Sequence, residues 1–134
     1  MQQVQHINPA ELHAQGYSNV IVVQGNVKTV YIGGQDAVNA KGEIVGKGDV
    51  GAQSAQVLDN IEIALAAAGA KLEHVIKWNI FVVQGHDFMP GYKVFQERWG
   101  DRPNLPIVTM AFVAGLARPE LLIEIEATAV VPEK

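Results

Sequence analysis

Cysteine is absent from this chain of 134 residues, which excludes a disulfide framework, a thiolate nucleophile and a cysteine-bound zinc site. Positive charge is also sparse. The chain has 10 Lys and Arg against 14 Asp and Glu, a formal net charge of −4. Binding to nucleic-acid phosphates takes a basic patch, and the few basic residues are scattered along the chain. The composition therefore argues against a nucleic-acid-binding protein.

Long apolar runs are missing as well. No stretch approaches the ~18 consecutive apolar residues of a transmembrane helix. The opening "MQQVQHINPAELHAQ" has no basic start followed by an apolar segment, so we expect no signal peptide and a soluble, cytoplasmic protein. Hydrophobic residues still make up 49% of the chain, which is enough for the core of a single domain over residues 1–134.

The usual catalytic and cofactor motifs are not found. Neither a "GxSxG" nor an "HExxH" pattern occurs. The stretch "GEIVGKG" looks like a phosphate-binding loop, but its glycines are one residue too close and Gly48 stands where Ser or Thr would bind magnesium. The histidines occur singly, without metal-ligand spacing; they are His6, His13, His74 and His86. We therefore predict no metal and no cofactor.

Runs of β-branched and apolar residues predict five strands. They lie in segments 19–35 (two strands), 74–85, 107–115 and 120–131. Gly25 and Asn26 tolerate positive φ and predict a tight hairpin between the first two strands. The glycine-rich segment 39–51 has no periodicity and predicts a long connection.

Two helices are predicted between these strands. The first begins at the N-cap Asp49 and ends near Gly69. The second covers 86–100, with Asp87 as its cap and Gly100 as its stop. Apolar residues at helical spacing predict the buried face of the first helix; they are Val57, Leu58, Ile61, Leu65 and Ala68.

The stretch "LLIEIEATA" alternates, which places Glu124 and Glu126 on one face of a strand and Ile123 and Ile125 on the other. Such glutamates commonly face solvent in an antiparallel sheet. The alternative is that one of them lines a site. Two helices cannot cover both faces of a mixed sheet, so we expect an uncovered face that favours self-association.

The order and spacing of several motifs resemble the Rid family of YjgF-like proteins. The motifs are "GYSNVIVVQG", "GGQ", "AQVLDNIEIALAAAGA" and "IEIEA", and the resemblance covers nearly the whole chain. The best known members hydrolyse reactive enamines and imines. The resemblance implies an α+β, chorismate-mutase-like domain with a mixed sheet, two helices on one face, and assembly as a homotrimer.

The resemblance also implies a site between subunits for a small-molecule ligand. The first glutamate of "IEIEA", here Glu124, matches the residue that holds the attacking water. Tyr17 matches the tyrosine at the cleft, and Gly34 matches the glycine whose backbone approaches the ligand. Glu126 is then structural or exposed.

One departure from the family pattern concerns the substrate carboxylate. The deaminases carry an arginine in a "PAR" turn, whose guanidinium binds the carboxylate bidentately. Aligning Pro106 with the family proline puts Val108, followed by Thr109, at this place, and Tyr92 lies near the position of the family asparagine. We expect Tyr92, Val108 and Thr109 to contact the substrate, with Arg102 or Arg118 as possible substitutes for the arginine.

Two classes of function remain open at this level. The first is a hydrolase for an imine, enamine or related carbonyl compound that differs from the standard substrates 2-iminobutanoate and 2-iminopropanoate. The second is a protein that binds a small metabolite without turnover, or has a regulatory role. A rate measurement separates the two.

Overall fold

The protein is described by a computed structural model that covers residues 2–14 and 16–134. A four-stranded sheet in the order β3-β6-β4-β5 forms its centre. The strands are β3 (Val27–Gln35), β4 (Val75–Val83), β5 (Ile107–Val113) and β6 (Ile123–Pro132). Strand β6 is antiparallel to β3 and β4, whereas β4 and β5 are parallel, so the sheet is mixed.

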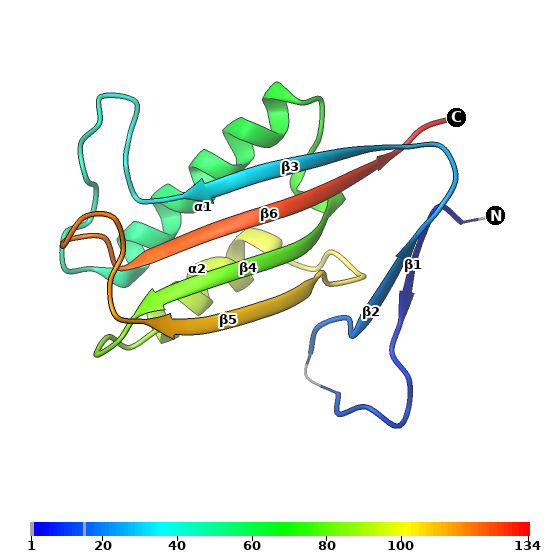
Figure 1. Cartoon of the computed structure of the whole chain (residues 1–134), viewed down its shortest axis with the longest axis horizontal. Helices are drawn as coiled ribbons and strands as arrows, with labels where there is room; N and C mark the ends of the chain where they lie inside the picture. Colours follow the sequence, from blue (N-terminus) through cyan, green and yellow to red (C-terminus); the bar gives the residue numbers. More distant parts are fainter. Residues whose placement is uncertain (1, 15) are drawn as a thin grey trace.

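Both long helices lie on the same face of this sheet (Figure 1). They are α1 (Val50–Ala67) and α2 (Met89–Trp99), and a short 3-10 turn, η1 (Leu72–His74), precedes β4. The predicted α+β class, with two helices on one face of a mixed sheet, is confirmed. No helix in the described part of the chain is long and apolar enough to cross a membrane.

The predicted hairpin at Gly25 and Asn26 is wrong. Strand β2 (Val20–Val23) pairs instead with β1 (Val4–Ile7), a strand that the sequence pattern did not indicate, and the two form a separate hairpin beside the main sheet (Figure 1). The Gln3 side chain donates to the carbonyls of Asn26 and Glu133. These bonds hold the start of β1 against the turn that follows β2 and against the C-terminal segment. Gly25, at φ 80°, lets the chain turn from one sheet into the other.

The boundaries of α1 are confirmed. The Asp49 side chain accepts a hydrogen bond from the backbone N–H of Ala52 at 3.0 Å, and Gly69 follows the helix at φ 72°. Of the residues predicted to be buried on α1, only Ala68 stays half-exposed; Val57, Leu58, Ile61 and Leu65 are buried.

Helix α2 begins one residue later than predicted. Phe88 is the N-cap, and Asp87, predicted as the cap, accepts from the backbone N–H of Met89 at 3.0 Å. Gly91 lets α2 approach α1 closely, because a Cβ there would lie 2.6 Å from Ser54 Oγ. The helix ends at Gly100, as predicted.

The face of the sheet away from the helices is open. Ile123, Ile125 and Ala127 of β6 are buried beneath the helices. On the opposite face Tyr31 is 81% exposed, and Glu124 is only partly buried. The uncovered face that was predicted from the presence of only two helices is therefore present in the chain.

Truncating the apolar face of α1 should destabilise the fold. We expect each of Leu58→Ala, Ile61→Ala and Leu65→Ala to lower the free energy of unfolding by about 2 to 5 kcal/mol, because each leaves a cavity in the core. Urea denaturation measures the change. Ile63→Ala is the matched control, since Ile63 lies on the same helix and is 68% exposed; losses below about 1 kcal/mol at all three buried sites would contradict the packing.

Candidate functional site

A β-bulge shapes the end of β3 that faces Glu124. Ile32 pairs with Ala127, but Gln35 pairs with Ile125, so β3 uses one residue more than β6 over this interval. Gly33 and Gly34 lie between the paired positions. A bulge bends its strand and re-aims the side chains that follow it, and so it determines what lies beside Glu124.

Glu124 and Gly34, both predicted site residues, are in direct contact. A Cβ built on Gly34 would lie 2.6 Å from Glu124 Oε2 and 2.8 Å from its Cδ. The carboxyl group therefore occupies the space that any other residue at position 34 would need for its side chain. On the other side of Glu124, Phe81 of β4 is its paired neighbour.

The surroundings raise the pKa of Glu124 from 4.5 to about 7. Burial is the largest cause, because it disfavours the charged carboxylate. A hydrogen bond with Asp36 and the negative charges of Asp36 and Glu126 act in the same direction. Near neutral pH the group is therefore present in both its acidic and its basic form, as a general acid–base catalyst requires.

Polar side chains on α1 hold the segments around Glu124. The Gln53 amide is fully buried; it donates to the carbonyl of Glu120 at 2.8 Å and accepts from the N–H of Leu122 at 2.8 Å, just before β6 begins. The Asn60 amide donates to the carbonyl of Asp36 at 3.0 Å. The start of β6, which carries Glu124, and the end of β3 beside it are thus anchored to the same helix.

Glu126, by contrast, is occupied within the sheet. It pairs with Asn79 of β4 and accepts a hydrogen bond from the Asn79 amide at 2.6 Å. Asn79 in turn pairs with Thr109 of β5, so Thr109 lies in this row on the open face. The predicted contact of Thr109 with substrate stays a prediction.

Three further predicted site residues surround one cavity, of about 510 Å³. Tyr17, Tyr92 and Val108 all line it. Trp78 and Phe95, whose rings meet edge to face at 5.0 Å, form part of its wall. Val108 alternates in β5 with Thr109 and so faces the helices, whereas Thr109 faces the open side. The cavity is largely aromatic and aliphatic.

Hydrogen bonds of Ser18 hold Tyr17 at this cavity. The neighbouring Ser18 is buried, and its hydroxyl donates to the carbonyl of Leu105 and lies 2.7 Å from Nδ1 of His6. His6 belongs to β1 and Leu105 to the turn before β5. These contacts of Ser18 therefore hold the N-terminal hairpin beside the cavity, and Tyr17 lines the cavity together with Val108.

The two groups of predicted site residues do not meet within one chain. Val108 pairs with Trp78, and Trp78 pairs with Ala127, three residues along β6 from Glu124. Three residues of strand span about 10 Å. Val108 also faces the helices, whereas Glu124 faces the open side. A site that uses both groups needs a second copy of the chain.

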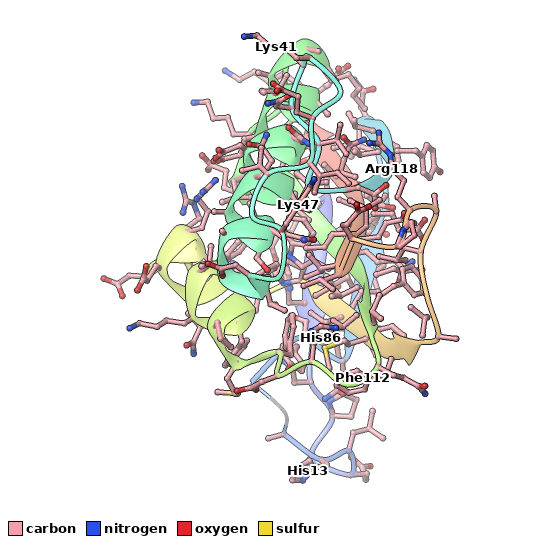
Figure 2. All side chains as sticks on the ribbon, turned by 90° about the vertical axis from the view of Figure 1, so that its left-hand side faces the viewer. His13, Lys41, Lys47, His86, Phe112 and Arg118 are labelled. Carbon is pink, nitrogen blue, oxygen red and sulfur yellow. The ribbon has the colours of Figure 1, made fainter. Side chains whose placement is uncertain are left out.

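Neither substitute arginine lines the cavity around Val108. Arg102 donates to the carbonyls of Arg98 and Trp99 at the end of α2. Arg118 donates to the carbonyl of Gly42, and Figure 2 shows it beside the loop that carries Lys41 and Lys47. The cavity therefore offers no guanidinium to a carboxylate.

Comparison with known proteins identifies the family. A family profile described as Endoribonuclease L-PSP matches residues 9–131. The chain belongs to the YjgF/Rid family. A RutC family protein from Pyrococcus horikoshii is 40% identical over 101 residues, which are 75% of this chain and 77% of that relative.

Solved Rid family structures have the same fold. The protein YyfB of the Rid family from Yersinia pestis is 35% identical, with a TM-score of 0.79, and the match covers 96% of this chain and 98% of that one. The protein TdcF from E. coli, solved with bound serine, is 29% identical with a TM-score of 0.69, and the match covers 78% and 81% of the two chains.

Asp36 is the neighbour of Glu124 that the sequence interpretation missed. It follows the "GGQ" motif directly, but its position relative to Glu124 depends on the bulge, which no periodicity in β3 announces. Two consecutive glycines in a strand are the signal that could have indicated it, since glycine within a strand often marks a bulge.

The raised pKa of Glu124 makes the stability of this Rid family protein depend on pH. Between pH 4.5 and about 7 the folded state binds this proton more strongly than the unfolded chain. The stabilisation is complete below pH 4.5 and is lost as the pH rises through about 7. We expect the wild type to lose stability relative to Glu124→Gln as the pH rises through this range, as measured by urea denaturation.

The difference in stability between the wild type and Glu124→Gln does not contain the contribution of His6 to the pH dependence. Burial lowers the pKa of His6 below 6.5, partly opposed by a hydrogen bond with the Leu105 backbone, so His6 lowers stability as the pH falls. This effect is common to both proteins and cancels in the difference. A difference between them that does not vary with pH would contradict the raised pKa of Glu124.

Proposed function

We propose that this Rid family protein hydrolyses a small imine or enamine in clefts between the subunits of a homotrimer. The observation that carries the proposal is the Glu124 carboxyl, which lies against the backbone of Gly34 with a pKa near 7. Such a group binds a water molecule, accepts its proton as the oxygen attacks the C=N carbon, and returns a proton to the nitrogen.

The separation of the two groups of residues supports a site between subunits, as in a homotrimer. Glu124 and Gly34 face the open side of the sheet, while Tyr17, Tyr92 and Val108 line a cavity on the helix side. Exposed apolar side chains such as Tyr31 on the open face favour coverage by another sheet. When subunits pack through this face, Glu124 of one subunit reaches the cavity of the next.

The cavity favours a substrate that is neutral or apolar where the standard family substrates carry a carboxylate. Val108 stands in place of the arginine, and Arg102 and Arg118 bind backbone carbonyls elsewhere. Losing a charge-assisted bidentate contact costs about 2 to 5 kcal/mol, which is more than a tenfold loss of rate. The bound serine in the related TdcF structure supports a ligand of about the size of an amino acid.

Cleavage of RNA, which the family description names, has little support in this chain. The net charge is −4, and the surroundings of Glu124 add Asp36 and Glu126. Binding of RNA requires Lys or Arg side chains that neutralise several phosphates, whereas the negative charges on this face would repel them.

Binding of a neutral metabolite without turnover is the second candidate function. The apolar wall around Val108 favours it as much as it favours hydrolysis.

The assembly is tested by its mass in solution. We expect a trimer of about 43 kDa, three times the 14.5 kDa chain, because the open face of the sheet has no cover within the chain. Sedimentation equilibrium measures the mass. A stable monomer at micromolar concentration would contradict both the trimer and the site between subunits.

The missing arginine is tested with 2-iminobutanoate, generated in situ from an amino acid by an oxidase. We expect the wild type to hydrolyse this imine little faster than the buffer, since no described residue that lines the cavity carries a positive charge for its carboxylate. Val108→Arg should raise the rate by about tenfold or more, provided that Tyr92 leaves room for the side chain. Ammonia release measures both rates.

Two variants control this experiment. Adding Glu124→Gln to Val108→Arg should abolish the gained activity, while Val108→Met, which lengthens the side chain without charge, should give no gain. An enzymatic rate in the wild type would show that another group binds the carboxylate, with Arg118 as the next residue to replace.

A further inference from the structure

Asp36 directly follows β3, and its side chain is hydrogen-bonded to that of Glu124. Gln35, the last residue of β3, pairs with Ile125, so continuing this register by one residue would bring Asp36 opposite Glu124. Residues that face each other in this way share one side of the sheet, and their Cβ atoms lie about 4.5 to 5.5 Å apart. The hydrogen bond between the two side chains that raises the pKa of Glu124 agrees with this position.

The bulge is what creates this pair. If the pairing of Ile32 with Ala127 continued without the extra residue, Asp36 would lie opposite Ile123, on the face that the helices cover. A shift of one residue moves a side chain to the other face of a sheet. The one added residue at Gly33 and Gly34 thus brings a second carboxyl group to the side of Glu124.

No described Lys or Arg side chain lies within ion-pair distance of these two carboxyl groups. Within residues 2–14 and 16–134, the ion pairs are those that Arg98 makes with Asp59 and Glu62. Glu126, on the same face, is negative and bonded to Asn79. Lys77 of β4 is paired with Thr128, further along the sheet.

One oxygen of Asp36 is also left without a partner. Asp36 Oδ1 is buried and accepts no hydrogen bond from any group in the described part of the chain. A buried carboxylate oxygen without a donor is costly, and two like charges directly opposite each other repel. A single proton held between the two carboxyl groups removes both costs, because a protonated carboxyl becomes a donor.

We infer that Asp36 and Glu124 share one proton and that this pair, rather than Glu124 alone, is the acid–base unit of the site. Asp36 is a positioning residue in this inference, since it acts on the reaction through Glu124. The acid–base role of the pair rests on the proposed function, whereas the sharing of a proton between the two side chains does not.

The pair supplies both proton transfers of imine hydrolysis. As the water oxygen bonds to the imine carbon, Glu124 takes a proton from the water and the shared proton moves to Asp36. The π electrons of the C=N bond pass to nitrogen, which takes the proton from Glu124. A second proton transfer of the same kind moves the proton of the new hydroxyl group to nitrogen. The C–N bond then breaks, which releases ammonia and a carbonyl product.

The sharing of the proton is tested by titrating Glu124 in the intact protein by carboxyl 13C NMR, with its signal assigned from its absence in Glu124→Gln. We expect the midpoint near pH 7 in the wild type to fall toward 4.5 in Asp36→Asn, because the amide is uncharged and donates to the carboxylate. Glu126→Gln is the matched control, as it removes a charge from the same face and should lower the midpoint less.

A second variant tests the contact without changing any charge. Gly34→Ala places a Cβ where the Glu124 carboxyl lies and should also lower its midpoint by displacing it from Asp36. Gly33→Ala is its control, since no atom lies within 4 Å of a Cβ there, and it should leave the midpoint in place. An unchanged midpoint in both Asp36→Asn and Gly34→Ala would overturn the inference.

The activity readout separates this inference from the proposed function. In the Val108→Arg protein, Asp36→Asn should shift the pH profile of imine hydrolysis in step with the NMR midpoint, which a merely structural role would not do. If the midpoint falls but no protein hydrolyses an imine, the pair stands and the proposed function fails. If hydrolysis persists with an unchanged pH profile, the function stands and the pair is refuted.

Discussion

The extra residue in β3 is the constraint on which the candidate site depends. Because β3 uses one residue more than β6 between Ile32 and Gln35, the backbone of Gly34 passes under the carboxyl of Glu124. The same shift directs Asp36 toward the open face. Removing the bulge would turn Asp36 to the helix side and leave Glu124 as an ordinary half-exposed glutamate of an antiparallel sheet.

Helix α1 connects this local feature to the rest of the fold. Its apolar face packs on the sheet, while Gln53 and Asn60 hold the segments next to Glu124 and Asp36. Buried polar groups of this kind specify one geometry, because each amide is satisfied only in that arrangement. The core and the candidate site therefore depend on the same helix, so a shift of α1 disturbs both.

Much of this arrangement could be predicted from the sequence. Alternation in "LLIEIEATA" predicted that Glu124 and Glu126 lie on one face of β6 and the isoleucines on the other, although it did not determine which face the helices cover. Asp49 and Gly69 marked the ends of α1 through their capping chemistry. The family resemblance supplied the residues Glu124 and Gly34, which the structure brings into contact.

Other features of the fold and the site could not be predicted, because the pattern of apolar and polar residues does not determine them. Strand β1 has only four residues, two of them polar, so it shows no clear period. The hydrogen bonds of the adjacent Gln3 go to Asn26 and Glu133, which are far from it in the sequence. The position of Asp36 depends on the register beyond the bulge. That Val108 and Glu124 face opposite sides follows only from the register of β4 with β5 and β6.

The measurement that tests the central claim most directly is the hydrolysis of an uncharged imine, formed in situ from a small primary amine by an amine oxidase. The protein should accelerate ammonia release well above the buffer rate, and Glu124→Gln should return the rate to that of the buffer. A wild-type rate equal to that of buffer for a range of uncharged imines would contradict the account and leave a protein that binds its ligand without turnover.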